Sequence, residues 1–174
     1  RDYQQDAYHT EKLDSNEVGL VGVFDGHGDH GPGEKVSEII AHGDIKYHNK
    51  ITNILNYILQ KIQKIEYNDK KMNDYLKALL ISYDKLLYKY YVNEFTKAGS
   101  TSSIALCYKS YIYAINSGDS KIILFGIPNN RNLPIQMFYE TPEHKPELLS
   151  ERKRILENDL EISEDGYIIN KSID

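Results

Sequence analysis

Asp25-Gly26-His27-Gly28 is the stretch of this sequence whose residue types could do chemistry. It places a carboxylate, a glycine with an accessible backbone carbonyl and an imidazole next to one another. Carboxylate and carbonyl oxygens bind hard cations, and an imidazole titrates near neutral pH. The stretch therefore indicates a metal or phosphate site. A strand that ends in a tight turn with a solvent-facing histidine explains the same residues, so the neighbouring segments must decide.

The elements that must position this stretch are a strand before it and a helix after it. Residues 18–24 are apolar and rich in Val, interrupted only by two glycines, which predicts a buried strand. Gly and Pro residues at 28–33 indicate a loop, and a helix is predicted to begin near Glu34 and end near Gly43. The polar residues 1–9 are predicted to be a loop or the edge of a sheet.

The rest of the chain shows helical periodicity first and strand-like patterns afterwards. Apolar residues three and four apart predict helices at 51–65 and 68–95. Strands are predicted at 102–108, 111–116, 121–126 and 135–139. A helix is predicted at 147–157, and Glu164-Asp165-Gly166 indicates a hairpin turn. Long helices followed by an antiparallel meander indicate an α+β fold.

Composition restricts the class of protein. The chain has 174 residues, 40% of them hydrophobic, which suits one globular domain. A net charge of −5 disfavours a nucleic-acid partner. The single cysteine, Cys107, lies in an apolar run, so we expect a buried, inert thiol and a reducing compartment. No apolar run approaches the roughly 20 residues that span a bilayer, and no signal peptide is visible.

Four separated fragments occur in a recognisable order. They are Gln5-Asp6-Ala7; Val23-Phe24-Asp25-Gly26-His27-Gly28; Gly99-Ser100-Thr101 leading to Asn116-Ser117-Gly118-Asp119-Ser120; and His144-Lys145-Pro146 with Glu151, Arg154 and Ile155. The ordered set resembles the metal-dependent PP2C (PPM) family of Ser/Thr protein phosphatases. The resemblance covers nearly the whole chain, but only the N-terminal portion of the family's catalytic domain. It implies an α-β-β-α sandwich of antiparallel sheets flanked by helices, incomplete in this chain.

The resemblance also implies a role for each residue of the site. Two Mg²⁺ or Mn²⁺ ions are implied, with Asp25 bridging them and the Gly26 carbonyl binding one. Asp6 is implied to orient metal-bound water, His27 to protonate the leaving seryl or threonyl oxygen, and Arg1 to clamp the substrate phosphate. Asp119, in the Gly118–Ser120 turn, is interpreted as structural.

Two positions depart from the family's pattern. Gln5 stands where many relatives have Glu, although the Gln-Asp pairing also occurs in the family. Glu143 stands where relatives have an Asp assigned to a weaker third metal site. Its carboxylate is one methylene further out, and it is a candidate ligand of a weak third ion.

The later aspartates of the family's metal cluster are not present in the sequence. We expect residues 1–174 to be a single domain, truncated before its C-terminal metal-ligand motifs, because the chain begins at Arg1 and ends at Asp174 in mid-pattern. One direct carboxylate neutralises two divalent ions poorly. We therefore expect this fragment alone to be inactive and its parent protein to be active.

The expected function is hydrolysis of phosphoserine and phosphothreonine in proteins, without a phosphoenzyme. The alternatives are an inactive PP2C-like interaction module and a metal-dependent phosphohydrolase of small phosphoesters. The expected partners are phosphoprotein substrates, with no nucleic acid and no membrane, for a monomer in the cytoplasm or nucleus rather than outside the cell.

Overall fold

An antiparallel sheet is the centre of the computed structural model, which describes residues 4–12, 18–28, 31–44, 51–66, 68–95, 97–128, 133–164, 166 and 168–169. The strands follow the spatial order β1-β2-β4-β5, and the short β3 pairs with the end of β2. These strands are β1 (Asp6–Lys12), β2 (Val18–His27), β3 (Gly99–Ser100), β4 (Ser102–Tyr108) and β5 (Tyr111–Ser117).

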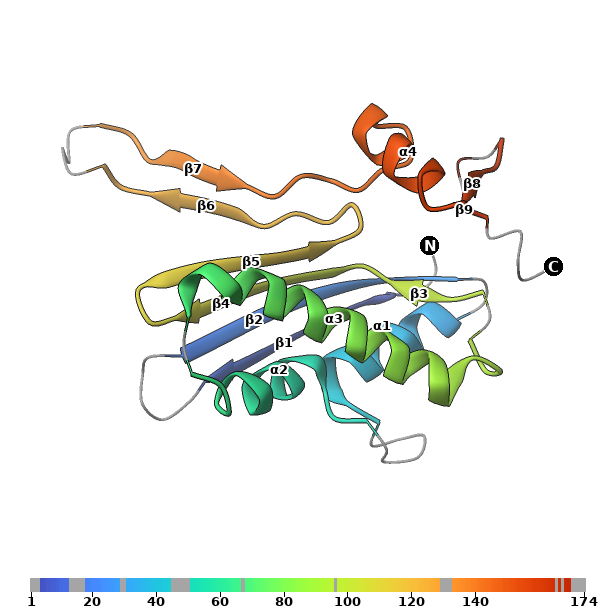
Figure 1. Cartoon of the computed structure of the whole chain (residues 1–174), viewed down its shortest axis with the longest axis horizontal. Coiled ribbons are helices and arrows are strands. Elements are labelled where there is room, and N and C mark those ends of the chain that lie inside the picture. Colours follow the sequence, from blue (N-terminus) through green and yellow to red (C-terminus); the bar gives the residue numbers. More distant parts are fainter. Residues whose placement is uncertain are drawn as a thin grey trace.

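Three helices cover one face of this sheet (Figure 1). They are α1 (Pro32–His42), α2 (Ile54–Ile62) and α3 (Asp69–Tyr91). The apolar stripes of the helices meet the inward-facing side chains of the strands, so the core lies between helices and sheet. Phe24, Leu55 and Ile104 are completely buried there.

The chain leaves the sheet after β5 and forms smaller elements. The hairpin of β6 (Ile123–Gly126) and β7 (Gln136–Glu140) lies on the β5 side of the sheet, away from the three helices (Figure 1). The helix α4 (Leu149–Leu156) and a two-stranded piece of β8 (Glu161–Ile162) and β9 (Ile168–Ile169) follow. The predicted α+β fold with antiparallel sheets flanked by helices is confirmed.

Two sequence predictions about burial are corrected by the alternation of side chains in the strands. The segment 18–24 was predicted to be a buried strand, but in β2 only every second side chain faces the helices. Val21 and Val23 point the other way and are 45% and 47% exposed. Cys107 was predicted to be buried, but it is exposed, because its neighbour Leu106 takes the inward position in β4.

The positions of most predicted elements agree with the structure, with shifts at their ends. The helix predicted at 51–65 is shorter and begins at Ile54, where the side chain of Asn53 accepts a hydrogen bond from the Asn56 amide at 2.8 Å. The N-terminal segment, predicted as a loop or sheet edge, is the regular edge strand β1 from Asp6 onward. No helix in the described part of the chain is long and apolar enough to cross a membrane.

Candidate metal centre

Asp25 lies near the end of β2 and faces Asp6 directly across the β1–β2 ladder. Directly opposed residues on neighbouring strands point to the same face of a sheet, and like charges in this position repel each other. The Asp6 carboxylate accepts a hydrogen bond from the Gln4 amide at 2.8 Å. Two facing carboxylates next to the backbone carbonyl of Gly26 offer the oxygen ligands that Mg²⁺ and Mn²⁺ prefer, and a cation would remove the repulsion. These three residues fit part of a divalent-metal site.

Gly26 is held so tightly that no larger residue fits. Its amide donates to the Gln5 carbonyl at 3.1 Å, and the Ser37 hydroxyl donates to the same carbonyl at 2.6 Å. A Cβ at Gly26 would lie 2.2 Å from the carbonyl oxygen of Gly33, at the start of α1. The helix backbone therefore packs directly on the end of β2, and the absence of side chains at both glycines makes this approach possible.

Gln5 and Ser37 are buried residues that join β1, the end of β2 and α1. The Gln5 side-chain amide donates to the Gly28 carbonyl at 3.3 Å, so Gln5 contacts both ends of the Gly26–Gly28 segment. Ser37 has no exposed surface although it lies in a helix. Its hydroxyl links α1 to the same Gln5 carbonyl, which positions the helix against the end of β2.

Thr101 holds Asp25 from the side opposite to Asp6. The Thr101 amide donates to the Asp25 carbonyl at 2.8 Å, and the Asp25 amide donates to the Thr101 hydroxyl at 3.0 Å. Both the amide and the carbonyl of Asp25 are thus hydrogen-bonded to Thr101, so the backbone that carries the Asp25 side chain is rigid.

His27 is the exposed residue at the end of β2. Its ring lies over Gly99 of β3, where an added Cβ would be 2.7 Å from Nε2. The pairing of His27 with Gly99 keeps the imidazole on the same strand end as Asp25, two residues away along the strand. This placement suits a group that exchanges a proton with a ligand bound beside the carboxylates.

Glu143 is placed in an ion-pair cluster instead of beside the two aspartates. Its carboxylate oxygens lie 2.8 Å from Lys145 Nζ and 3.1 Å from Lys121 Nζ. Hydrogen bonds from Lys145 and then Lys121 hold the pKa of Glu143 below its usual range. No three His, Cys, Asp or Glu side chains within the described ranges are grouped so that they could hold a metal. The structure therefore brings Asp6, Asp25 and Gly26 together, while Glu143 is engaged by lysines.

Arg1, expected to bind the substrate phosphate, lies outside the described residues. Asp119 lies in the turn after β5. This turn is tied to the His144-Lys145-Pro146 segment, because the Gly118 amide donates to His144 Nδ1 at 3.3 Å and the His144 amide donates to the Gly118 carbonyl at 3.0 Å. His144 is therefore a hydrogen-bonding residue of this turn.

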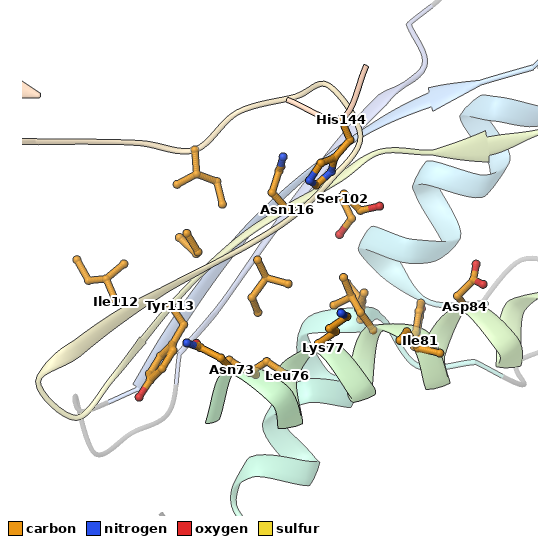
Figure 2. Close-up of a pocket in the computed structure, with 18 of the residues that line it drawn as sticks. Asn73, Leu76, Lys77, Ile81, Asp84, Ser102, Ile112, Tyr113, Asn116 and His144 are labelled. Atoms are coloured by element: carbon orange, nitrogen blue, oxygen red, sulfur yellow. The ribbon is translucent and has the colours of Figure 1, made fainter. Parts of the chain in front are cut away.

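A pocket of about 1270 Å³ lies elsewhere, between α3 and the edge strand β5. Figure 2 shows Leu76, Lys77 and Ile81 on the helix side and Tyr113 on the strand side. None of Asp6, Asp25, Gly26 and His27 lines it. The pocket thus does not include these four residues, although Ser100, which pairs with Gly26, lines it.

Sequence reasoning did not identify the supporting roles of Ser37 and Thr101. A serine on the buried side of an amphipathic helix was the available signal for Ser37, since a buried hydroxyl needs a partner. Thr101 belonged to a recognised fragment, but its contact with Asp25 joins positions 76 residues apart and depends on the register of the sheet.

The family model described as Protein phosphatase 2C matches residues 3–173. This chain belongs to the PP2C family. The resemblance drawn from its motifs is thereby confirmed.

Curated PP2C relatives match most of the chain but are much longer. "Probable protein phosphatase 2C 2" of Paramecium tetraurelia is 28% identical over 167 residues, which are 89% of this chain and 47% of the relative. "Protein phosphatase 1L" of Bos taurus is 29% identical over 163 residues, covering 89% of this chain and 39% of the relative. The chain thus spans about half the length, or less, of these relatives.

A solved structure shows the same fold. The serine-threonine phosphatase 2C from Toxoplasma gondii superposes with a TM-score of 0.60 at 20% identity, covering 97% of this chain and 55% of that chain. At this identity the likeness establishes the shared fold of the sheet and its helices.

Proposed function

We propose that this PP2C chain carries the N-terminal part of the catalytic centre of a protein serine/threonine phosphatase. The observation that carries the proposal is the rigidly held Asp25–Gly26 end of β2 facing Asp6, in a member of this family. Activity belongs to the full-length protein, because the curated relatives are about twice as long as this chain.

Each residue of the candidate metal centre has a separate role. Asp25 and the Gly26 carbonyl hold the divalent ions, and Asp6 orients the attacking water. Two Mg²⁺ or Mn²⁺ ions supply neutralisation of the phosphoryl charge and activation of that water. A weaker third ion near Glu143 is disfavoured by the two lysines on its carboxylate.

His27 delivers the proton that the reaction requires. The bond between phosphorus and the seryl or threonyl oxygen breaks as water attacks, and the departing oxygen takes a proton from the imidazole. Arg1 binds the phosphate oxygens through its planar guanidinium. Inorganic phosphate and the free hydroxyl side chain are the products, and no covalent phosphoenzyme forms.

Steady-state kinetics of the full-length protein with a phosphothreonine peptide and Mn²⁺ test the proposal. His27→Gln is expected to lower kcat by about 10²–10⁴-fold, the range for loss of a general acid, without a change in Mn²⁺ affinity. His42→Gln, at an exposed histidine of α1, is the matched control and is expected to keep the wild-type rate.

The same assay separates the alternatives. Faster turnover of a nucleotide monophosphate than of the phosphopeptide would favour a small-phosphoester hydrolase. No turnover of either substrate with Mn²⁺ bound would favour a PP2C-like interaction module and contradict the proposal.

A further inference from the structure

On the side of β2 that faces β3 and β4, the strand ladder is interrupted at Phe24 and Asp25, whereas on the other side Asp25 pairs with Asp6. Gly26 pairs with Ser100 in β3 and Val23 pairs with Ser103 in β4, so Thr101 lies opposite Asp25 although it belongs to neither strand. A regular hydrogen-bonded antiparallel pair exchanges two amide-to-carbonyl bonds. Only one is present here, from the Thr101 amide to the Asp25 carbonyl.

The Thr101 hydroxyl replaces the missing carbonyl. It accepts the hydrogen bond of the Asp25 amide at 3.0 Å, while the Thr101 carbonyl accepts a hydrogen bond from the Ser100 hydroxyl at 2.8 Å. The hydrogen-bond acceptor of the Asp25 amide is thus a side chain and not a backbone carbonyl. Such an acceptor moves with its rotamer, whereas a ladder carbonyl is fixed by the strand.

The turn after β5 fixes that rotamer. The Ser120 hydroxyl lies 3.0 Å from Thr101 Oγ1. Gly118, in the left-handed region with φ of 99°, approaches so closely that an added Cβ would lie 2.7 Å from the Thr101 methyl. Both branches of the Thr101 side chain are therefore engaged, and only 8% of the residue is exposed.

We propose that Thr101 is a positioning residue for Asp25 and that Ser120 orients its hydroxyl. Through these two hydroxyls the Gly118–Ser120 turn sets the backbone at Asp25, and with it the direction of the carboxylate. The inference rests on the proposed function, because it gives Asp25 the role of a metal ligand. Groups that orient a ligand typically change metal affinity by 10–100-fold when they are removed.

Two substitutions separate the hydroxyl from the shape of the side chain. Thr101→Val keeps both branches but removes the acceptor, and Thr101→Ser keeps the acceptor but removes the methyl group. In the full-length protein, we expect Thr101→Val to weaken Mn²⁺ binding about 10-fold by calorimetric titration and Thr101→Ser to keep the wild-type affinity. Hydrogen exchange in EDTA is expected to show faster exchange of the Asp25 amide in Thr101→Val alone.

The outcomes distinguish this inference from the proposed function. Wild-type Mn²⁺ affinity in Thr101→Val, with only a lowered melting temperature in EDTA, would show a purely structural role and overturn the inference. A wild-type protein that does not bind Mn²⁺ would overturn the proposed function itself. If Thr101→Val does not fold, Ser120→Ala replaces it, and unchanged Mn²⁺ affinity and unchanged Asp25 amide exchange in that variant would overturn the inference.

Discussion

Gly26 and Gly33 show at the scale of single residues how the candidate centre is built. The backbone at the start of α1 touches the end of β2 that carries Asp25, and each glycine leaves room for the backbone of the other segment. The turn that the sequence predicted at Asp25–Gly26 was wrong, because β2 continues to His27, and the sequence did not indicate this contact. The contact depends on where α1 packs, which local patterns do not determine.

Gly26→Ala is therefore expected to destabilise the protein. The new Cβ would lie 2.2 Å from the Gly33 oxygen and 2.8 Å from the Gln5 oxygen, both backbone atoms that cannot move aside alone. A loss of about 1–3 kcal/mol in the free energy of unfolding is expected from such overpacking, measured by urea denaturation in EDTA.

Gly19→Ala is the matched control for this prediction. Gly19 lies in the same strand, but an added Cβ would meet only the Glu11 carbonyl oxygen, at 4.0 Å. Its effect is expected to stay within about 0.5 kcal/mol. Equal stability of Gly26→Ala and Gly19→Ala would contradict the close packing of α1 on the end of β2.

Glu151 provides a pH-dependent prediction at the same scale. Its buried carboxylate accepts hydrogen bonds from Arg154 Nε at 3.0 Å, and these bonds lower the pKa of Glu151 from its ordinary value of 4.5. A carboxyl whose pKa is lowered by folding stabilises the native state above its unfolded pKa. This stabilisation is lost as the pH falls through the folded-state pKa.

Glu151→Gln should therefore cost stability near neutral pH, and the cost should disappear in acid. Because Arg154 is largely exposed, we expect a difference of only about 1 kcal/mol at pH 7, shrinking as the pH falls below about 4. Glu157→Gln, at an exposed carboxylate 3.7 Å from Lys153, serves as the control and should show no measurable difference. A Glu151→Gln effect that is constant from pH 7 to pH 3 would contradict the ion-pair explanation.

At the scale of elements, α2 and α3 are each preceded by an asparagine, but only one of the two asparagines caps its helix. The Asn53 side chain caps α2 by accepting a hydrogen bond from the Asn56 amide at 2.8 Å. Asn68 precedes α3 but makes no side-chain cap bond. The same residue type therefore has a capping role at only one of the two helices.

Asn53→Ala is expected to lower the free energy of unfolding by about 1 kcal/mol, because an amide of the first turn loses its partner. Asn68→Ala should have little effect. Thermal or urea unfolding of the two variants measures both values, and equal losses would show that the cap at Asn53 contributes nothing specific.

The elements also show what sequence patterns could and could not predict. Helical spacing identified α1, α2 and α3, and alternation identified β4 and β5 nearly to the residue. β1 was not predicted as a regular strand because its residues are mostly polar and only its pairing with β2 defines it. The helices predicted at 51–65, 68–95 and 147–157 extend beyond both ends of α2, α3 and α4, since periodicity continues into the segments beside a helix.

At the scale of the whole molecule, the sheet has two unlike faces. One face is covered by α1, α2 and α3 and contains the core. The other carries exposed apolar side chains such as Val21, Val23 and Ile112, which are 45%, 47% and 52% exposed. A continuous apolar run in β2 suggested burial on both sides, but the run alone does not show how many layers surround a strand.

The candidate centre was partly predictable at this scale as well. The order of the motifs identified the family and named Asp6, Asp25, Gly26 and His27, which the structure places at one end of the β1–β2–β3 ladder. The motif alone could not place the Glu143 carboxylate, because its position depends on ion pairs with Lys121 and Lys145.

The most direct test of the central claim is Mn²⁺-dependent hydrolysis of a phosphothreonine peptide by the full-length protein and its Asp25→Asn variant. Asp74→Asn, at an exposed aspartate of α3, is the control. We predict that EDTA abolishes wild-type turnover, that Asp74→Asn matches the wild type, and that Asp25→Asn has no Mn²⁺-dependent turnover. Turnover by Asp25→Asn equal to that of the wild type would contradict the assignment of Asp25 as a metal ligand.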